Sequence, residues 1–216
     1  MSIQSEEFLR FIKLLNDNDC LEYVILVGSW AEFLYGESGI MPGFEPNIKT
    51  LDIDFLLKNL RRPVVPVNLI NLAKAEGYLV DSDYITGATK IMDKHGLEIE
   101  FILSKAGAGT ENVLRTNLGV TAQTLRHMNI IAHNTRTIEY YEMPISVPEP
   151  EAYIIQKMII NDQRGVKKEK DRLAVINLWP YINKDTFSEI YNCLTKKEKT
   201  IVDSFLKNNN MIFRTD

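Results

Sequence analysis

The sequence has little cysteine and no long apolar run. Its 216 residues include two cysteines, Cys20 and Cys193, which are far apart and form no C-x-x-C pattern. This excludes a zinc ribbon and a disulfide framework, and it favours a reducing compartment. No stretch reaches the roughly 18 consecutive apolar residues of a membrane span, and no basic segment followed by an apolar one opens the chain. We therefore expect a cytoplasmic protein with no membrane partner.

The chain also lacks an excess of positive charge. It carries 25 Lys and Arg against 29 Asp and Glu, a formal net charge of -4, which excludes a histone-like protein that coats nucleic acid through bulk charge. Residues 148–216 carry 12 basic against 10 acidic side chains, a net +2, whereas residues 1–147 carry 13 against 19, a net −6. This uneven division indicates two parts with different tasks.

Hydrophobic periodicity predicts an α+β (α/β) fold with a central mixed sheet flanked by helices, followed by a mainly helical region. We expect one domain at residues 1–147 and a second at residues 148–216. Predicted strands cover residues 23–27, 50–57, 78–80, 89–92, 97–103, 137–141 and 145–147, with a turn at residues 81–83. Predicted helices cover residues 5–17, 30–35 and 66–76, a helix that opens at residues 148–151 and ends near residue 161, and most of the chain after residue 165. Breakers at residues 36–49 predict a loop, either an acceptor-binding element or an insertion.

Three short motifs carry residue types suited to metal and phosphate chemistry: Gly28-Ser29 at a strand-to-helix turn, Asp52-x-Asp54 in a strand, and Glu98-x-Glu100 in a later strand. Because side chains alternate across a strand, each acidic pair points to one face, with Cβ atoms ~6 to 7 Å apart. Acids crowded on adjacent strands repel one another unless solvent, basic partners or bound cations compensate. Magnesium prefers carboxylate and phosphate oxygens, so the pattern favours a magnesium site, with two ions in phosphoryl transfer. Gly28 and Ser29 supply close backbone approach, a hydroxyl and a helix start for a polyphosphate.

The sequence resembles the nucleotidyltransferase superfamily that shares its fold with DNA polymerase beta. The resemblance rests on Gly28-Ser29 within residues 27–31, on Asp52-x-Asp54 within residues 50–56, and on residues 97–102 in the place of the third-acid strand. Residues 145–157 and the pair Lys170-Asp171 are similar to the second half of AbiEii-like enzymes, a group of abortive-infection or type IV toxin proteins. The resemblance covers about residues 21–178.

The resemblance implies transfer of a nucleoside monophosphate from a nucleoside triphosphate to an acceptor hydroxyl or phosphate, with pyrophosphate released. Asp52, Asp54 and Glu100 would be the catalytic and magnesium-binding carboxylates, with Glu98 as a competitor for the role of Glu100. The nucleotide would be bound by Gly28, Ser29, Lys157 and Asp171, the last of these near the site and paired with a lysine. Lys49 would be the basic residue near the acidic motif.

The resemblance does not identify the acceptor, since members of the superfamily act on tRNA ends, proteins, antibiotics or small metabolites. Two alternatives stand beside the enzyme. One is a catalytically silent module that binds a nucleotide or a protein partner without turnover. The other is a toxin-like enzyme that acts on tRNA and has an antitoxin partner, for which the basic run at residues 167–172 is the sequence hint.

Overall fold

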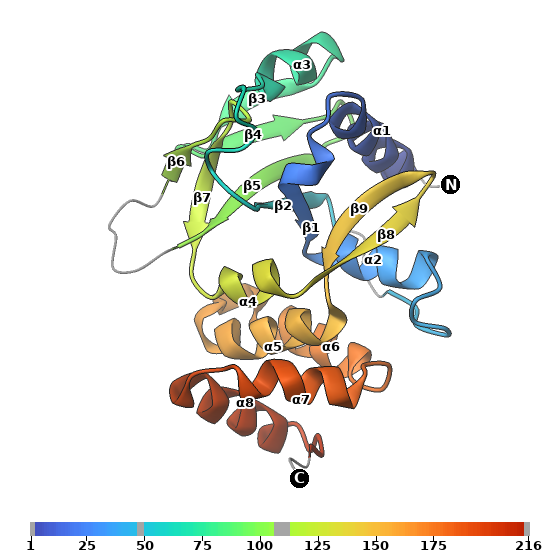
Figure 1. Ribbon diagram of the computed structural model, residues 1–216, viewed down its shortest axis with the longest axis vertical. Coiled ribbons are helices and arrows are strands. Elements are labelled where there is room, and N and C mark those ends of the chain that lie inside the picture. Colours follow the sequence, from blue (N-terminus) through green and yellow to red (C-terminus); the bar gives the residue numbers. More distant parts are fainter. Residues whose placement is uncertain (1–2, 47–49, 106–112, 214–216) are drawn as a thin grey trace. The chain divides into compact units, whose positions relative to one another are not determined.

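A computed structural model describes residues 3–46, 50–105 and 113–213 of the chain (Figure 1). Lys49 lies outside these residues. The chain divides into two compact units, Met1–Val147 and Pro148–Asp216. Within the described residues, no helix is both long enough and apolar enough to cross a bilayer.

The first unit is built from helices and strands that alternate along the chain. Its helices are α1 (Ile3–Asp17), η1 (Leu21–Tyr23), α2 (Ser29–Glu37), α3 (Leu69–Ala75) and α4 (Met128–His133). Its strands are β1 (Val24–Val27), β2 (Asp52–Leu57), β3 (Leu79–Ser82), β4 (Thr89–Met92), β5 (Glu98–Ser104), β6 (Val113–Arg115), β7 (Thr121–Leu125), β8 (Thr135–Tyr140) and β9 (Met143–Pro148).

Seven of these strands form one mixed sheet. Its main order is β1-β2-β5-β4-β3, and β7 pairs with β5 and carries β6 on its other edge. Figure 1 shows β5 between β2 on one side and β4 and β7 on the other. The pairs β2/β5 and β5/β7 are parallel, whereas the other pairs of this sheet are antiparallel. The predicted central mixed sheet is therefore confirmed.

One face of the sheet is packed against α1. The apolar residues of α1 recur at helical spacing, and Phe8, Phe11 and Ile12 are fully buried. The ring of Phe11 lies 5.9 Å from that of Phe55 on β2, and Phe55 stacks at 6.1 Å on Phe101 of β5. This face is apolar along the whole length of both strands.

The opposite face of β2 and β5 is divided into an acidic half and an apolar half. Helix α4 packs Met128 and Ile131 into a buried cluster with Leu56 of β2 and Ile102 of β5. Residues two and four positions earlier on each strand share this face because side chains alternate. They are Asp52, Asp54, Glu98 and Glu100. The acids therefore lie on the part of the face that precedes the apolar cluster under α4.

The second unit consists of helices around a central one. It contains α5 (Pro150–Ile160), η2 (Asn161–Gln163), η3 (Gly165–Lys167), α6 (Lys168–Leu178), α7 (Lys184–Asn192) and α8 (Lys196–Asn208). Helix α5 is buried on all sides from Pro150 to Ile159, and α6, α7 and α8 pack against it. The mainly helical C-terminal region is thus confirmed.

Some predicted elements need correction. The turn expected at residues 81–83 comes later, because Asp81 and Ser82 belong to β3 and the chain reverses between Asp83 and Gly87. The predicted loop begins later than residue 36, since α2 continues to Glu37. Helix α4 and the strands β6 and β7 have no counterpart in the sequence-based prediction.

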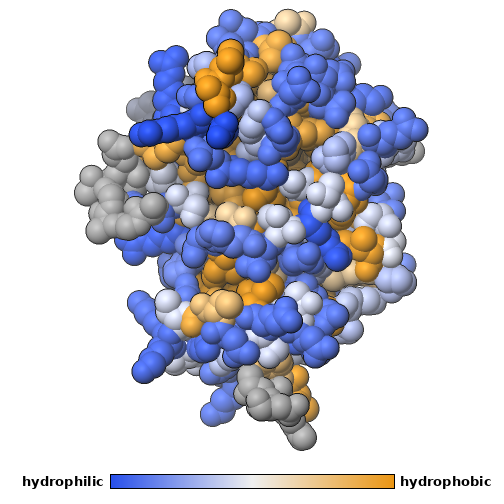
Figure 2. Space-filling view, viewed as in Figure 1, coloured by the Kyte–Doolittle hydropathy of each residue, from blue (hydrophilic) through white to orange (hydrophobic). Residues whose placement is uncertain are grey.

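Large apolar side chains are exposed at several places. Figure 2 shows apolar surface interrupted by hydrophilic surface on the face that it presents. In the first unit, Tyr84 and Ile85 are almost fully exposed in the turn between β3 and β4. Solvent therefore reaches this turn, which also contains Asp83.

Candidate functional site

The bend between β1 and α2 is fixed by Gly28. Its φ of 73° and ψ of −157° are a combination that side chains with a Cβ rarely adopt. A Cβ on Gly28 would lie 2.8 Å from Oδ2 of Asp54, because the neighbouring Val27 pairs with Asp54 across the sheet. Glycine is thus required here both for the backbone conformation and for the space beside Asp54.

Ser29 links this bend to the start of the aspartate strand. Its side chain is largely buried, and its Oγ lies 2.5 Å from Oγ1 of Thr50. Thr50 Oγ1 donates to the carbonyl oxygen of Asp52 at 3.3 Å, and Trp30 Nε1 donates to the carbonyl oxygen of Thr50 at 3.2 Å. The first turn of α2 and the first residues of β2 are therefore held together by hydrogen bonds. The leading N–H groups of a helix have no partner within it and favour an anion.

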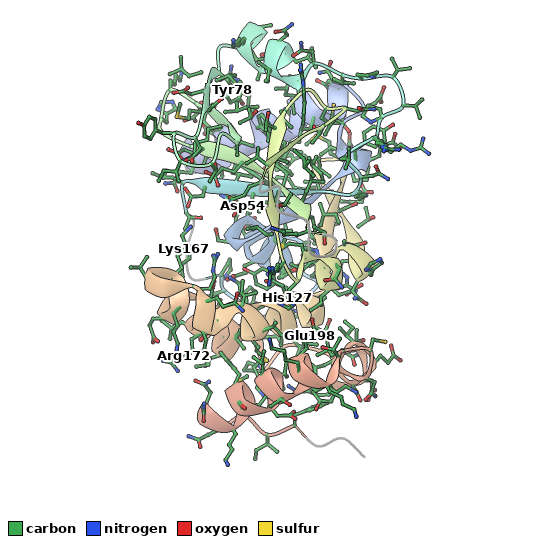
Figure 3. The ribbon with its side chains drawn as sticks, turned by 90° about the vertical axis from the view of Figure 1, so that its left-hand side faces the viewer. Asp54, Tyr78, His127, Lys167, Arg172 and Glu198 are labelled. Carbon is green, nitrogen blue, oxygen red and sulfur yellow. The ribbon has the colours of Figure 1, made fainter. Side chains whose placement is uncertain are left out.

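The two acidic pairs lie on the same face of the sheet. Parallel pairing of β2 and β5 sets Asp52 opposite Glu98 and Asp54 opposite Glu100. Neighbouring strands lie about 4.8 Å apart, so the paired residues are direct neighbours. All four are partly exposed, whereas the intervening Ile53 and Ile99 are buried. Figure 3 labels Asp54 on the sheet. The structure thus brings the acidic motifs together, and Gly28 adjoins them at Asp54.

Lys90 is a member of this site that the sequence-based prediction missed. It lies on β4 opposite Glu100, and its Nζ is 3.1 Å from Glu98 Oε2 and 3.1 Å from Glu100 Oε1. A third carboxylate, Asp83 Oδ2, lies 3.6 Å away. Hydrogen bonds to Glu100 and Glu98 hold the pKa of Lys90 above its usual range, so the side chain is a permanent cation.

The carboxylates do not form a preorganised metal-binding site. Among residues 3–46, 50–105 and 113–213, no group of three or more His, Cys, Asp or Glu side chains is placed so that it could hold a metal ion. The predicted set of Asp52, Asp54 and Glu100 is therefore not assembled as three ligands in this arrangement. One of these carboxylates, that of Glu100, is in a salt bridge with Lys90.

In the second unit, Lys157 and Asp171 contact each other. Lys157 Nζ lies 2.5 Å from Asp171 Oδ1, and Arg164 Nε lies 2.7 Å from Asp171 Oδ2. Asp171 is 2% exposed. Burial alone would raise the pKa of Asp171, but the charges and hydrogen bonds of Lys157 and Arg164 outweigh burial and lower it. The predicted pairing of Asp171 with a lysine is present, and Lys157 is that lysine.

The second unit also contains a pocket of ≈ 490 Å³ between α5, α6 and α8. Its polar lining includes Asn161, Lys168, Arg172 and Asn209, and Arg172 is labelled in Figure 3. The cations in it are already engaged, since Arg172 pairs with Glu169 and Lys168 with Asp162. None of the predicted site residues lines this pocket, so we do not assign the predicted active site to it despite its size.

One comparison with known proteins identifies a family, and another finds similar solved structures. A family model described as nucleotidyltransferase matches residues 6–190. The chain is similar to the crystal structure of an antigenic nucleotidyltransferase-like protein from Paracoccidioides brasiliensis, with 13% identity, a TM-score of 0.53, and 95% of this chain and 90% of that chain covered. It is also similar to ANT(2")-Ia in complex with adenylyl-2"-tobramycin, with 13% identity, a TM-score of 0.45, and 94% and 97% covered. No match was found among curated proteins.

The two kinds of match support different statements. At 13% identity, the likeness to the Paracoccidioides brasiliensis structure shows the fold. The family match spans most of the chain and includes the Gly28–Ser29 bend and both acidic strands. On this evidence, the chain belongs to the nucleotidyltransferase family.

Proposed function

We propose that the protein transfers a nucleoside monophosphate from a nucleoside triphosphate to an acceptor hydroxyl or phosphate, with release of pyrophosphate. The observation that carries the proposal is the close approach of Gly28 to Asp54, where a Cβ would have no room, which sets a helix start beside a face of four carboxylates. A helix N-terminus favours phosphate, and carboxylates favour the hard cations that accompany polyphosphates. The acidic motifs are followed along the chain by Lys157 and the pair Lys170-Asp171 in the second unit. This order supports a relationship to the AbiEii-like group.

The residues at this face fit magnesium in their chemistry. Asp52 and Asp54 offer oxygen donors on one face of β2, partly open to solvent, and neither a sulfur nor an imidazole ligand is needed. These two aspartates would hold the ion, and Glu100 would be the third carboxylate once its salt bridge to Lys90 is exchanged. When bound, the ion supplies neutralisation of the charge on the phosphoryl and pyrophosphate oxygens.

The remaining steps belong to the chain's own groups. Gly28 lets the triphosphate approach the backbone, while the first N–H groups of α2 and the Ser29 hydroxyl orient it. The acceptor oxygen attacks the α-phosphorus in line. A phosphorus–oxygen bond forms as the bond to the pyrophosphate oxygen breaks, and Glu100 helps to take the acceptor's proton.

For Lys157 and Asp171, we propose a supporting role in addition to the predicted nucleotide contact. The ammonium of Lys157 is already satisfied by a buried carboxylate, so it would bind phosphate only by sharing Asp171. Their ion pair joins α5 to α6 and favours a structural contribution.

The test is incubation with each labelled nucleoside triphosphate and magnesium, across total RNA and cell extract, with pyrophosphate release as the readout. We expect one triphosphate to label an acceptor, and Asp52→Asn to lower the rate on the order of 10²-fold, the scale of losing one electrostatic stabiliser of a transition state. Asp17→Asn, at an exposed acid at the end of α1, is the matched control. Full transfer by a folded Asp52→Asn variant would refute the assignment.

A further inference from the structure

The acidic face contains a cation of its own. Lys90 Nζ is equidistant, at 3.1 Å, from Glu98 and Glu100. Two carboxylates that share a strand face repel each other, and a single ammonium between them offsets that repulsion. The glutamates are therefore already neutralised in part, and by a group that belongs to the chain.

The backbone fixes Lys90 in this place. Strand β4 pairs with β5 on one side, where Lys90 is opposite Glu100, and with β3 on the other, where Lys90 is opposite Asp81. The side chains of Lys90, Glu98 and Glu100 are 25%, 35% and 36% exposed. In such a partly solvent-shielded position, the attraction between opposite charges is stronger than it is in open water.

A third carboxylate offers Lys90 an alternative ionic partner. Asp83 Oδ2 lies 3.6 Å from Lys90 Nζ, on the side of the turn between β3 and β4. The ammonium can therefore leave the glutamates and still keep an ionic partner.

We propose that Lys90 competes with a divalent cation for Glu98 and Glu100, so that this lysine sets how tightly the acidic face binds metal. The proposal rests on the metal role that the proposed function gives to this face. Lys90 and a metal ion exclude each other, because a carboxylate oxygen that is paired with the ammonium is occupied and because two cations beside the same carboxylates repel each other. Metal that reaches the glutamates drives Lys90 toward Asp83.

The test is the affinity for Mn²⁺ alone, measured from the paramagnetic resonance signal of free Mn²⁺ in the absence of nucleotide and acceptor. Lys90→Met removes the charge and keeps an unbranched side chain, and we expect it to bind Mn²⁺ at least about tenfold more tightly than the native protein. Lys90→Arg keeps the charge and should stay within about threefold of the native affinity. Lys74→Met, at an exposed lysine of α3, controls for net charge and should change nothing. Equal affinity in Lys90→Met and the native protein overturns the proposal.

A second measurement uses the unaltered protein, so it does not depend on whether a variant folds. The rate of lysine acetylation is followed residue by residue by mass spectrometry, with and without Mn²⁺. Competition predicts that Mn²⁺ speeds the acetylation of Lys90 severalfold, since the ammonium exchanges two carboxylate partners for one, and that it leaves the rate at Lys74 unchanged. An unchanged rate at Lys90, under conditions where Mn²⁺ is bound, contradicts the proposal.

These outcomes are separate from those of the proposed function. Absence of nucleotidyl transfer, together with tighter Mn²⁺ binding by Lys90→Met, refutes the enzyme and supports the role of Lys90. Transfer by the native protein, together with an unchanged affinity in Lys90→Met, supports the enzyme and refutes the role of Lys90.

Discussion

Gly28 determines both the backbone conformation of the bend before α2 and the space beside Asp54. Gly28→Ala should lower the free energy of unfolding by about 1–3 kcal/mol, because it places a Cβ in a backbone region that is nearly restricted to glycine. It also pushes against Asp54 Oδ2, which lies 2.8 Å from the new atom. Urea unfolding measures the loss, and nucleotide transfer should fall with it.

Gly39 provides the control for this prediction. Its φ of 71° is nearly the same, but a Cβ there would meet no atom within 4 Å. Gly39→Ala therefore places a Cβ at a similar positive φ without the contact to Asp54, and we expect a smaller loss. Equal losses in the two variants would show that the approach to Asp54 contributes nothing.

At the same scale, the sequence allowed the acidic face to be predicted but not its cation. The placement of Asp52 and Asp54 on one side follows from strand alternation alone. The contact of Lys90 with Glu98 and Glu100 depends on the register of the hairpin β4–β5, in which Lys90 is opposite Glu100. A lysine within a short strand directly before an acidic strand was the available signal. To use this signal, one must predict which strands pair, and not only where the strands lie in the sequence.

Among the elements, α4 confines the acids to one half of their sheet face. Ile131 of α4 is 2% exposed in the cluster with Leu56 and Ile102. Ile131→Ala should lower the free energy of unfolding by about 2–5 kcal/mol, because it removes buried methyl groups and leaves a cavity. Ile212→Ala, at a side chain that is 77% exposed, should change stability by less than about 0.5 kcal/mol. Thermal or urea unfolding of both variants checks the difference, and a negligible loss in Ile131→Ala would mean that α4 is not needed to cover the face.

Clear periodicity or a clear start signal decides which elements the sequence reveals. The predicted strands at residues 23–27 and 50–57 correspond to β1 and β2, and the helix expected to end near residue 161 corresponds to α5. These segments have clear periodicity or a clear start, such as Pro150 at the first turn of α5. Helix α4 has six residues and β6 has three, too few for a period to show. Such short elements are specified by what they pack against, which a single sequence does not display.

At the scale of the whole molecule, the two units depend on different kinds of interaction. The first unit is centred on a sheet that pairs segments far apart in the sequence, such as β2 with β5. The second is a set of consecutive helices around α5, and in it the buried Asp171 pairs with the buried Lys157 and with the partly exposed Arg164. The uneven charge of the chain indicated this difference only in outline, because burial and pairing cannot be read from a net charge.

Asp171 makes the stability of the whole molecule depend on pH. Because its pKa is lowered in the folded protein, the unfolded chain binds more protons between that lowered value and the ordinary aspartate pKa of about 3.9. The stabilisation is therefore fully present above the ordinary value and is lost as the pH falls through the lowered one. Asp171→Asn should cost about 3–5 kcal/mol near neutral pH, because it leaves the buried Lys157 and the partly exposed Arg164 without their carboxylate.

The decisive measurement is the difference in unfolding free energy between the native protein and Asp171→Asn as a function of pH. The difference should be constant above about pH 5 and should narrow below the ordinary aspartate pKa, since protonated Asp171 resembles the amide. Glu169→Gln on the same helix is the control. The side chains of Glu169 and its partner Arg172 are 64% and 35% exposed, so solvent screens this pair and we expect its loss to change stability little. A difference that stays constant down to pH values well below the ordinary aspartate pKa would mean that the carboxylate of Asp171 is not the source of the stability lost in acid.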